Sequence, residues 1–226
     1  MTDYRIEKIF DAAGRLFINP GYNQTQVDHI VKACGISVGA LYDLFTGKKA
    51  ILKFILTCII EPDYINRDIS LPIDEEQFIG LEQEIIAFFS IRNSDFTSHL
   101  SNVNKDYTFD KMLADAYDNI ASYGMGLLIL EKNPSALPKL FSVYKDYRKQ
   151  FFSGIVSYMA AYAKQGVIKL AYPVEFAAIF IVETMIWWAV DMRYDAFEPR
   201  NDIPRETARS FCIDTLQSAF GYSAEK

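Results

Sequence analysis

The stretch GISVGALYDLF, residues 35–45, decides the fold. Gly35 can adopt the positive φ that ends a helix, and Ser37 can cap the next helix with its side-chain oxygen. Leu41 and Phe45 follow at helical spacing, so we expect them to face inward. Two helices joined by a short turn that contains glycine predict a helix-turn-helix unit, whose second helix can enter the major groove of DNA.

The residues on either side predict the other helices of this unit. An apolar stripe within 6–17 predicts a first helix, which the turn at 19–21 ends. A second stripe within 27–34 predicts the helix before the glycine, with Thr25 as its N-cap. A fourth helix is expected over 48–61, where the next proline stops it.

Most of the remaining chain also has helical periodicity. Apolar residues recur every three or four positions, and runs that alternate like strands are missing. We predict an all-α fold with an N-terminal three-helix helix-turn-helix DNA-binding domain, residues 1–50, and a larger helical ligand-binding and dimerisation domain, residues 51–226. The later helices are expected at 74–92, 95–104, 110–132, 137–166, 173–195 and 204–220.

Charge and composition limit the classes of function. The 226 residues carry a formal net charge of −6, which argues against a general coat for nucleic acid. Residues 1–52 hold six basic and five acidic side chains, so contact with phosphate is expected there. Because the sequence has neither a membrane-spanning apolar run nor a signal-peptide core, we expect a cytoplasmic protein that spans no membrane.

Catalytic and metal-binding motifs are missing from the sequence. His29 and His99 belong to no Glu-x-x-His pair, and the three cysteines match no zinc or disulfide spacing. There is neither a glycine-rich phosphate loop nor a nucleophile elbow. We therefore expect no enzymatic activity, no catalytic residue, no metal site and no cofactor.

Three segments, IFDAAGRLFINPGY, TQVDHIVKACGISVGALYDLF and GKKAIL, carry a pattern at fixed spacing between residues 9 and 52. The pattern resembles the TetR family of bacterial transcriptional regulators. The matching positions are Ile9, Ala12, Ala13, Leu16, Phe17, Gly21, Tyr22, Thr25, Gly35, Ile36, Ser37, Gly39, Leu41, Tyr42, Phe45 and Lys48.

The resemblance implies DNA contacts at particular positions. It places Thr25, Tyr42 and Lys48 on phosphates. The positions that it places near base edges are Ser37, Val38, Ala40 and Asp43, and Gly39 belongs to the same outward, DNA-binding face. Of these, Val38 can contact a thymine methyl, whereas Asp43 can accept from a cytosine amino group but repels phosphate. Lys49 stands where relatives often have an acid and adds a further cation.

Beyond residue 53 the resemblance is one of architecture. It implies a homodimer formed through the helices near 173–195 and 204–220, unless these helices simply pack within one chain. Small residues along them suit close approach of helices: Ala177, Ala178, Thr184, Ala189, Ala208, Cys212, Ser218 and Ala219.

An effector pocket is expected in the same domain. The 17 Phe, 14 Tyr and 2 Trp of the chain favour a small apolar or aromatic effector, although any single one of them is more often a core residue. The candidate effector-binding residues are Phe88, Tyr123, Tyr144, Tyr158 and Glu183. Glu183, an acid within an apolar helix, can instead pair across a dimer or face solvent.

Together these features predict a ligand-responsive transcriptional regulator. We expect a repressor that binds a pseudo-palindromic operator in double-stranded DNA as a homodimer and is released by a small-molecule effector. The alternative is a protein of the same fold that has lost DNA recognition and serves as a ligand-binding or adaptor protein. The absence of Lys and Arg from 35–45, together with Asp43, gives that alternative its weight.

Overall fold

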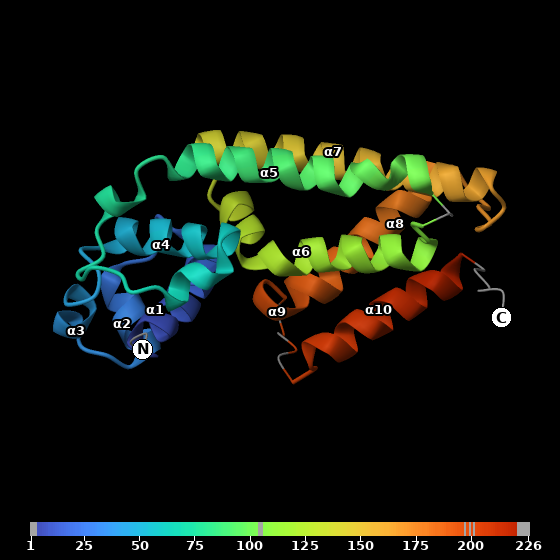
Figure 1. The fold of residues 1–226 in the computed structure, drawn as a ribbon. Coiled ribbons are helices and arrows are strands. Elements are labelled where there is room, and N and C mark those ends of the chain that lie inside the picture. Colours follow the sequence, from blue (N-terminus) through green and yellow to red (C-terminus); the bar gives the residue numbers. More distant parts are fainter. Residues whose placement is uncertain (1–3, 104–105, 197, 199, 201, 221–226) are drawn as a thin grey trace. The chain divides into compact units, whose positions relative to one another are not determined.

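A computed structural model describes residues 4–103, 106–196, 198, 200 and 202–220, and these residues form an all-α fold (Figure 1). The α-helices are α1 (Tyr4–Leu16), α2 (Val27–Cys34), α3 (Val38–Tyr42), α4 (Lys48–Ile60), α5 (Leu81–Thr97), α6 (Phe109–Lys132), α7 (Pro138–Lys164), α8 (Val174–Ile186), α9 (Met192–Tyr194) and α10 (Arg205–Ala219). Short 3-10 helices occur at Pro62–Asn66, Glu75–Phe78 and Ser98–Asn102, and π-helical turns at Phe17–Gly21 and Trp187–Asp191. The predicted all-α class is confirmed.

Two predicted helix boundaries differ from the structure. The segment expected as one helix over 74–92 contains a 3-10 turn and then a break at Gly80, whose φ is 90°, before α5 begins. The separate helix expected at 95–104 does not form, because α5 continues to Thr97 and is followed by a 3-10 turn. Apolar periodicity alone did not reveal the left-handed backbone at Gly80.

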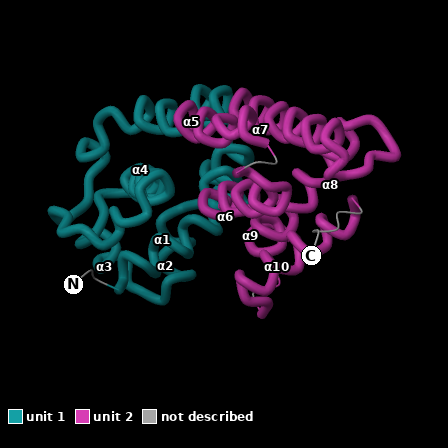
Figure 2. Tube along the Cα trace, turned by 45° about the vertical axis from the view of Figure 1, so that its right-hand side comes forward, with its two compact units in different colours: residues 1–88, 125–144 teal, residues 89–124, 145–226 magenta. Residues whose placement is uncertain are grey.

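The chain divides into two compact units (Figure 2). Unit 1 comprises residues 1–88 and 125–144, and unit 2 comprises residues 89–124 and 145–226. Helices α5, α6 and α7 each have residues in both units. The helix-turn-helix region therefore belongs to the same compact unit as the middle segment of the chain.

The core of unit 1 is formed by the apolar stripes that the sequence shows. The buried side chains of α1 to α4 are mostly branched aliphatic and aromatic, and include Ile9, Ala13, Phe17, Ile30, Leu41, Leu44, Phe45, Ile51, Phe54 and Ile55. The rings of Phe45 and Phe54 meet edge to face with their centroids 5.4 Å apart. This contact ties the end of α3 to the middle of α4.

The core of unit 2 contains five of the eight small residues that the sequence offers for close helix approach, whereas Thr184, Ser218 and Ala219 are not buried. The five buried residues are Ala177, Ala178, Ala189, Ala208 and Cys212. Close approach also occurs at Gly124 of α6, where a Cβ atom would lie 2.8 Å from a side-chain carbon of Val190. These small residues therefore serve packing within one chain, and large apolar side chains of α8 are left outside.

None of the helices in the described part of the chain combines the length and the apolar character needed to cross a membrane.

Candidate nucleic-acid interface and ligand cavity

The turn between α2 and α3 has the geometry that its sequence predicts. Gly35 adopts a left-handed conformation with φ 68° and ψ 35°, and ends α2. The Ser37 hydroxyl oxygen accepts a hydrogen bond of 3.1 Å from the backbone N–H of Ala40 and so caps α3. Both predicted capping roles are confirmed. The turn fixes the direction in which α3 leaves α2.

Helix α3 has a buried face and an exposed face. Leu41 is fully buried, whereas the side chains of Val38 and Tyr42 are 43% and 48% exposed. Gly39 and Asp43 are exposed as well, and Ala40 is half-buried. The face of α3 that we expect to contact DNA thus lies at the surface of unit 1. Its side chains are small apart from that of Tyr42.

Thr25 is not the N-cap of α2, contrary to the sequence-based expectation. Gln26 holds that position in an extended conformation, and its backbone N–H donates to Nδ1 of His29 at 3.3 Å. The Thr25 side chain is fully buried, and its hydroxyl is within hydrogen-bonding distance of the carbonyl oxygens of Leu16 (2.9 Å) and Gly21 (2.8 Å). The hydroxyl therefore ties the α1–α2 turn together, and in this conformation it does not face a phosphate.

Lys48 also makes contacts inside the unit. Its ammonium group donates to the carbonyl oxygens of Tyr22 (2.7 Å) and Thr25 (2.8 Å), and lies 4.2 Å from the centroid of the Tyr22 ring. Partial burial lowers its pKa. Lys48 thus joins the start of α4 to the segment before α2, and its charge stays near the N-terminal turn of α4.

Residues 73–75 lie against the end of α3. The backbone N–H of Ile73 donates to Leu44 (2.7 Å), and the backbone N–H of Thr46 donates to Ile73 (2.9 Å). The Thr46 hydroxyl donates to Asp74 at 2.8 Å. We call residues 73–75 the strap. Its hydrogen bonds hold the loop between α3 and α4.

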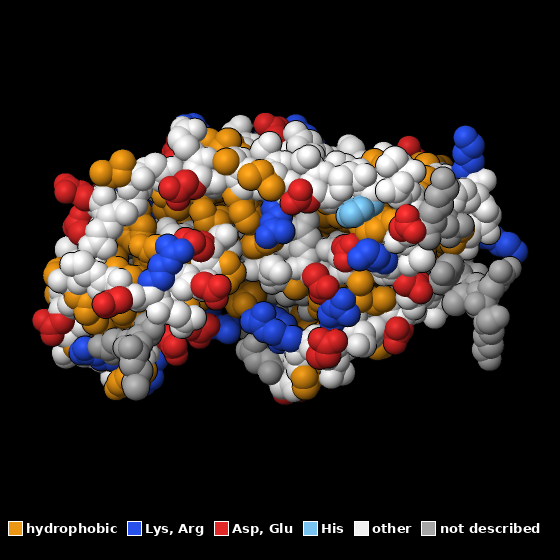
Figure 3. Space-filling view, in the orientation of Figure 1, with side chains coloured by type: hydrophobic (Ala, Val, Ile, Leu, Met, Phe, Trp, Pro, Cys, Tyr) orange, Lys and Arg blue, Asp and Glu red, His pale blue; other side chains and the backbone are white. Residues whose placement is uncertain are grey.

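The strap also neutralises a cation at the start of α4. The ammonium group of Lys49 lies 2.6 Å from the Glu75 carboxylate, and that of Lys53 lies 3.6 Å from it. The hydrogen bond from Lys49 lowers the pKa of Glu75. On the face drawn in Figure 3, basic and acidic side chains are interspersed, and no broad basic patch forms. Lys49, expected as an added cation for DNA, is thus already paired.

Asn133, which follows α6, connects to the turn between α1 and α2 within unit 1. Its amide nitrogen donates to the carbonyl oxygens of Phe17 (2.7 Å) and Ile129 (2.8 Å), and its amide oxygen accepts from the backbone N–H of Tyr22 (2.7 Å). The side chain is buried. A buried side chain with three such bonds fixes the helix-turn-helix region to the end of α6.

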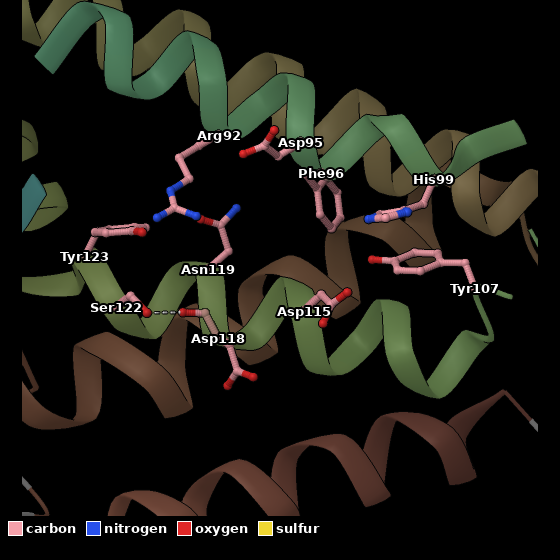
Figure 4. A pocket seen from close by; sticks show the side chains of 10 residues that line it. All are labelled: Arg92, Asp95, Phe96, His99, Tyr107, Asp115, Asp118, Asn119, Ser122 and Tyr123. Atoms are coloured by element: carbon pink, nitrogen blue, oxygen red, sulfur yellow. Dashed lines mark hydrogen bonds between the residues drawn. The ribbon is translucent and has the colours of Figure 1, made fainter. Parts of the chain in front are cut away.

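A cavity of about 360 Å³ lies within unit 2 (Figure 4). Its lining is more polar than the expected aromatic pocket. The lining residues are Arg92, Asp95 and Phe96 of α5, His99 and Tyr107 of the segment between α5 and α6, and Asp115, Asp118, Asn119, Ser122 and Tyr123 of α6.

The charged groups of the cavity differ in how far they are neutralised. Asp118 accepts two hydrogen bonds from Arg209, of 2.6 and 2.8 Å. Asp115 is 3.8 Å from the ammonium group of Lys111 on an exposed turn of α6. The Arg92 guanidinium lies 5.3 Å from the centre of the Tyr123 ring. Within the described part of the chain, no group of His, Cys, Asp and Glu side chains is arranged to hold a metal ion.

Comparison with known proteins identifies the N-terminal region. Residues 9–55 match the family model described as bacterial regulatory proteins, tetR family. In this region the chain is thus similar to regulators of the TetR family. An uncharacterized HTH-type transcriptional regulator of Bacillus subtilis (strain 168), YuxN, is 46% identical over 48 residues. That match spans 21% of this chain and only 16% of the relative.

Solved structures of the TetR family have a similar fold over the whole chain. The ketosteroid transcriptional regulator KstR2 of Mycobacterium tuberculosis has a TM-score of 0.53 at 17% identity, covering 100% of this chain and 98% of that one. SCO3833 of Streptomyces coelicolor A3, a member of the TetR family, has a TM-score of 0.50 at 13% identity, covering 96% and 91%. At these identities the likeness concerns the fold alone.

Of the effector candidates named from the TetR resemblance, only Tyr123 lines the cavity. Tyr144 is buried in unit 1 and donates to Glu131 at 3.1 Å, and Phe88 is the last residue of that unit's first segment. Tyr158 is buried in unit 2 and donates to the carbonyl of Phe96. Glu183 is exposed and lies 3.9 Å from Arg148. The structure does not bring these five residues together.

The sequence analysis missed most of the polar lining. Arg92 and Asp95 are three residues apart on α5, and Asp115, Asn119 and Tyr123 are four apart on α6. Each set is thus a polar stripe at helical spacing. A search for such stripes on two long helices could have drawn attention to them. An isolated stripe is more often a solvated face, so only the structure shows that the two line one cavity.

An exposed apolar face on unit 2 runs along α8 and includes Tyr172 before the helix and Trp187 after it; we call it the exposed face of α8. The side chains of Tyr172, Phe176, Ile179, Phe180 and Trp187 are all about half exposed or more, and they recur at spacings of one, three, four and seven residues. Phe211 of α10 is also exposed, and its ring centroid lies 4.8 Å from that of Trp188. A contiguous set of large exposed apolar side chains is typical of a protein interface.

Proposed function

We propose that the protein is a transcriptional regulator of the TetR family that binds double-stranded DNA and responds to a small molecule. One observation carries the proposal: residues 9–55 combine the family pattern with a capped helix α3 whose outward face is exposed. The family is described as regulatory proteins, so catalysis is not part of the proposal.

DNA binding is assigned to residues 1–50 and effector binding and dimerisation to residues 51–226. The exposed face of α3 would lie in the major groove, with Val38 and Ala40 toward base edges and the Tyr42 hydroxyl toward a phosphate. Lys48 supports this unit and adds positive charge near the N-terminal turn of α4. Phosphate contact by Thr25 would require the α1–α2 turn to open, so we assign Thr25 a supporting role.

A homodimer would cover the exposed face of α8. Phe176, Phe180 and Trp187 give this face enough apolar surface to favour association, and α10 lies beside it through the contact between Trp188 and Phe211. Two copies would then present two α3 helices to successive major grooves, about 34–36 Å apart, on a pseudo-palindromic operator.

The effector would bind in the cavity of unit 2 and act through α6. This helix carries Asp115, Asn119 and Tyr123 of the cavity lining, and the residue after its end, Asn133, is hydrogen-bonded to the α1–α2 turn. A ligand that binds more tightly to one position of α6 favours that position. Repression that the effector relieves is the direction we propose.

A salt titration of DNA binding tests the proposal. The purified protein and labelled DNA from its own genomic neighbourhood should form a complex whose affinity falls steeply with salt, as phosphate contacts require. Tyr42→Phe should weaken this complex, whereas the control Tyr64→Phe should not. If no specific complex forms even in low salt, the adaptor alternative, which the uncharged face of α3 favours, replaces the regulator.

A further inference from the structure

We propose that the cavity of unit 2 binds a small organic cation, an ammonium group attached to a flat apolar ring. The inference that this ligand is the effector of a regulator rests on the proposed function. The inference that it binds in the cavity rests on the lining residues alone. The volume of about 360 Å³ is at the lower end of ordinary small-molecule sites. The class of ligand follows from which polar atoms of the lining lack partners.

Two buried polar atoms of the lining have no hydrogen-bond partner. The Tyr107 side chain is 1% exposed, and its hydroxyl makes no well-formed hydrogen bond to a described residue, although burial and then the neighbouring Asp115 carboxylate, as a hydrogen-bond acceptor, raise its pKa. In Figure 4 this hydroxyl points into the space between Phe96 and Asp115. The amide oxygen of Asn119 is likewise buried without a partner. Buried polar atoms are normally satisfied, so the cavity is arranged to hydrogen-bond with a molecule that it holds.

These unpartnered atoms call for a donor. An amide oxygen only accepts, and a tyrosine oxygen accepts as well as donates. Burial raises the pKa of Tyr147 to about 12, and a hydrogen bond that the Asn119 amide donates to the Tyr147 hydroxyl opposes this increase. The amide nitrogen of Asn119 thus donates within the protein, whereas its amide oxygen has no partner among the described residues. A ligand N–H group satisfies the Asn119 oxygen, which a ligand carboxylate cannot do.

Negative charge in the same lining favours a charged donor. Asp95 forms no ion pair with any residue that the structure describes, and Asp115 lies 3.8 Å from Lys111 and next to the Tyr107 hydroxyl, to which it is a potential hydrogen-bond acceptor. Asp118 contributes little, because Arg209 neutralises it through two hydrogen bonds. The carboxylates of Asp95 and Asp115, which come from α5 and α6, can therefore attract an ammonium group.

Flat side chains complete the site. The rings of His99 and Tyr107 are stacked with their centroids 4.4 Å apart and an angle of 16° between the planes. Phe96 lies beside them in the lining (Figure 4). Aromatic walls of this kind bind a flat ring and stabilise a nearby cation. The Arg92 guanidinium lies over the Tyr123 ring, and the Lys111 ammonium group lies 5.9 Å from the centre of the Tyr107 ring. The ring of the described lining that is left for a ligand cation is therefore that of Phe96.

Calorimetric titration of the purified full-length protein at neutral pH tests the ligand class. The probe is 2-phenylethylamine, which is cationic at that pH. Its neutral and anionic counterparts are 2-phenylethanol and 3-phenylpropanoate. We expect binding of the amine, at least tenfold weaker binding of the alcohol and no detectable binding of the acid. If the acid binds, through Arg92, or if all three fail to bind, the inferred ligand class is wrong.

Variants locate the binding site. Asp95→Asn and Asp115→Asn should each weaken amine binding at least tenfold, and Tyr107→Phe should weaken it several-fold. Asp214→Asn, an exposed acid of α10 outside the lining, should leave it unchanged. Circular dichroism confirms that each variant folds. Equal binding by wild type and both cavity variants would place the amine elsewhere and overturn the proposal.

A DNA-binding measurement separates this inference from the proposed function. If the amine binds in the cavity but does not change DNA affinity, the ligand class stands and the effector role fails. If the protein binds DNA but the amine does not bind, the regulator stands and the ligand class fails.

Discussion

The helix-turn-helix region and the cavity of unit 2 differ in whether their polar side chains already have partners within the protein. Near α3 the cations and hydroxyls are already bonded within the protein: Lys48 to two carbonyls, Lys49 to Glu75 and Thr25 to the α1–α2 turn. In the cavity, Tyr107 and Asn119 keep buried polar atoms without partners. The first region is therefore built for a fixed shape, and the second is prepared to receive hydrogen bonds.

This difference has a consequence for DNA binding. The face of α3 offers shape, apolar contacts and one hydroxyl, whereas the nearest cations are held by the protein. We expect binding that depends on the correct placement of two α3 helices more than on positive charge. The predictions below change one region at a time, and they run from the largest expected effect to the smallest.

Loss of the buried ring that follows α3 should have the largest effect. Phe45, three residues after the helix, is fully buried against Phe54. We expect Phe45→Ala to lower the free energy of unfolding by about 3–5 kcal/mol, as large-to-small core substitutions do. Val38→Ala, on the exposed face of α3, should change it by less than about 0.5 kcal/mol. Chemical denaturation measures both. Similar values for the two variants would contradict the assignment of the faces.

A charge on the exposed face of α8 should separate the subunits. Phe176 is 61% exposed, so Phe176→Glu should cost the single chain little. In a dimer interface it would bury a charge, and we expect the dissociation constant to rise at least about 100-fold. The matched control is Ile91→Glu on α5, at a side chain that is 59% exposed. Sedimentation velocity should show monomers only for Phe176→Glu. If both variants sediment like the wild type, α8 is not the interface.

Removal of the Lys48 ammonium group should lower the free energy of unfolding, and this effect should come before any effect on the affinity for DNA. Lys48→Met loses two hydrogen bonds to carbonyl oxygens, and we expect a loss of about 1–2 kcal/mol at this half-exposed position. Lys49→Met, which breaks an ion pair at an exposed position, should cost less than about 0.5 kcal/mol. The unfolding curves of the two variants measure these losses of stability. Equal stability of Lys48→Met and the wild type would show that the carbonyl contacts contribute nothing.

Release of Lys49 should have the smallest effect and the opposite sign. Glu75→Gln removes the carboxylate that pairs with Lys49, and frees this cation for phosphate. We expect DNA affinity to rise several-fold and the slope of log affinity against log salt to steepen by about 0.9. Glu76→Gln changes the net charge equally but removes an exposed acid beside the pair, so it should have the smaller effect. Equal gains from both variants would assign the effect to net charge alone.

The two regions also differ in how far the sequence predicts them. The capping roles of Gly35 and Ser37 and the buried positions of α3 follow from contacts within a few residues, and the structure confirms them. The N-cap of α2 was assigned wrongly because the Thr25 hydroxyl bonds to Leu16, nine residues earlier. Local preference cannot reveal such a bond.

The cavity depends on pairings between different helices, so the sequence predicted only Tyr123 among its lining residues. Asp95 and Asp115 lie on different helices, and nothing in either helix indicates that both line one cavity. Phe17 and Tyr22, two of the hydrogen-bond partners of Asn133, are likewise more than one hundred residues away in the sequence. Helical periodicity predicts which side of a helix is polar. It does not predict which polar side becomes enclosed.

Selection of bound DNA from a random pool tests the central claim most directly. The wild-type protein should enrich a pseudo-palindromic site whose half-sites are separated by about one helical turn. Val38→Ala should shift the preferred bases, whereas Tyr42→Phe should lower affinity for all sequences alike. If no site is enriched in low salt, or if both variants select the same site with the same affinity as the wild type, the exposed face of α3 does not read DNA.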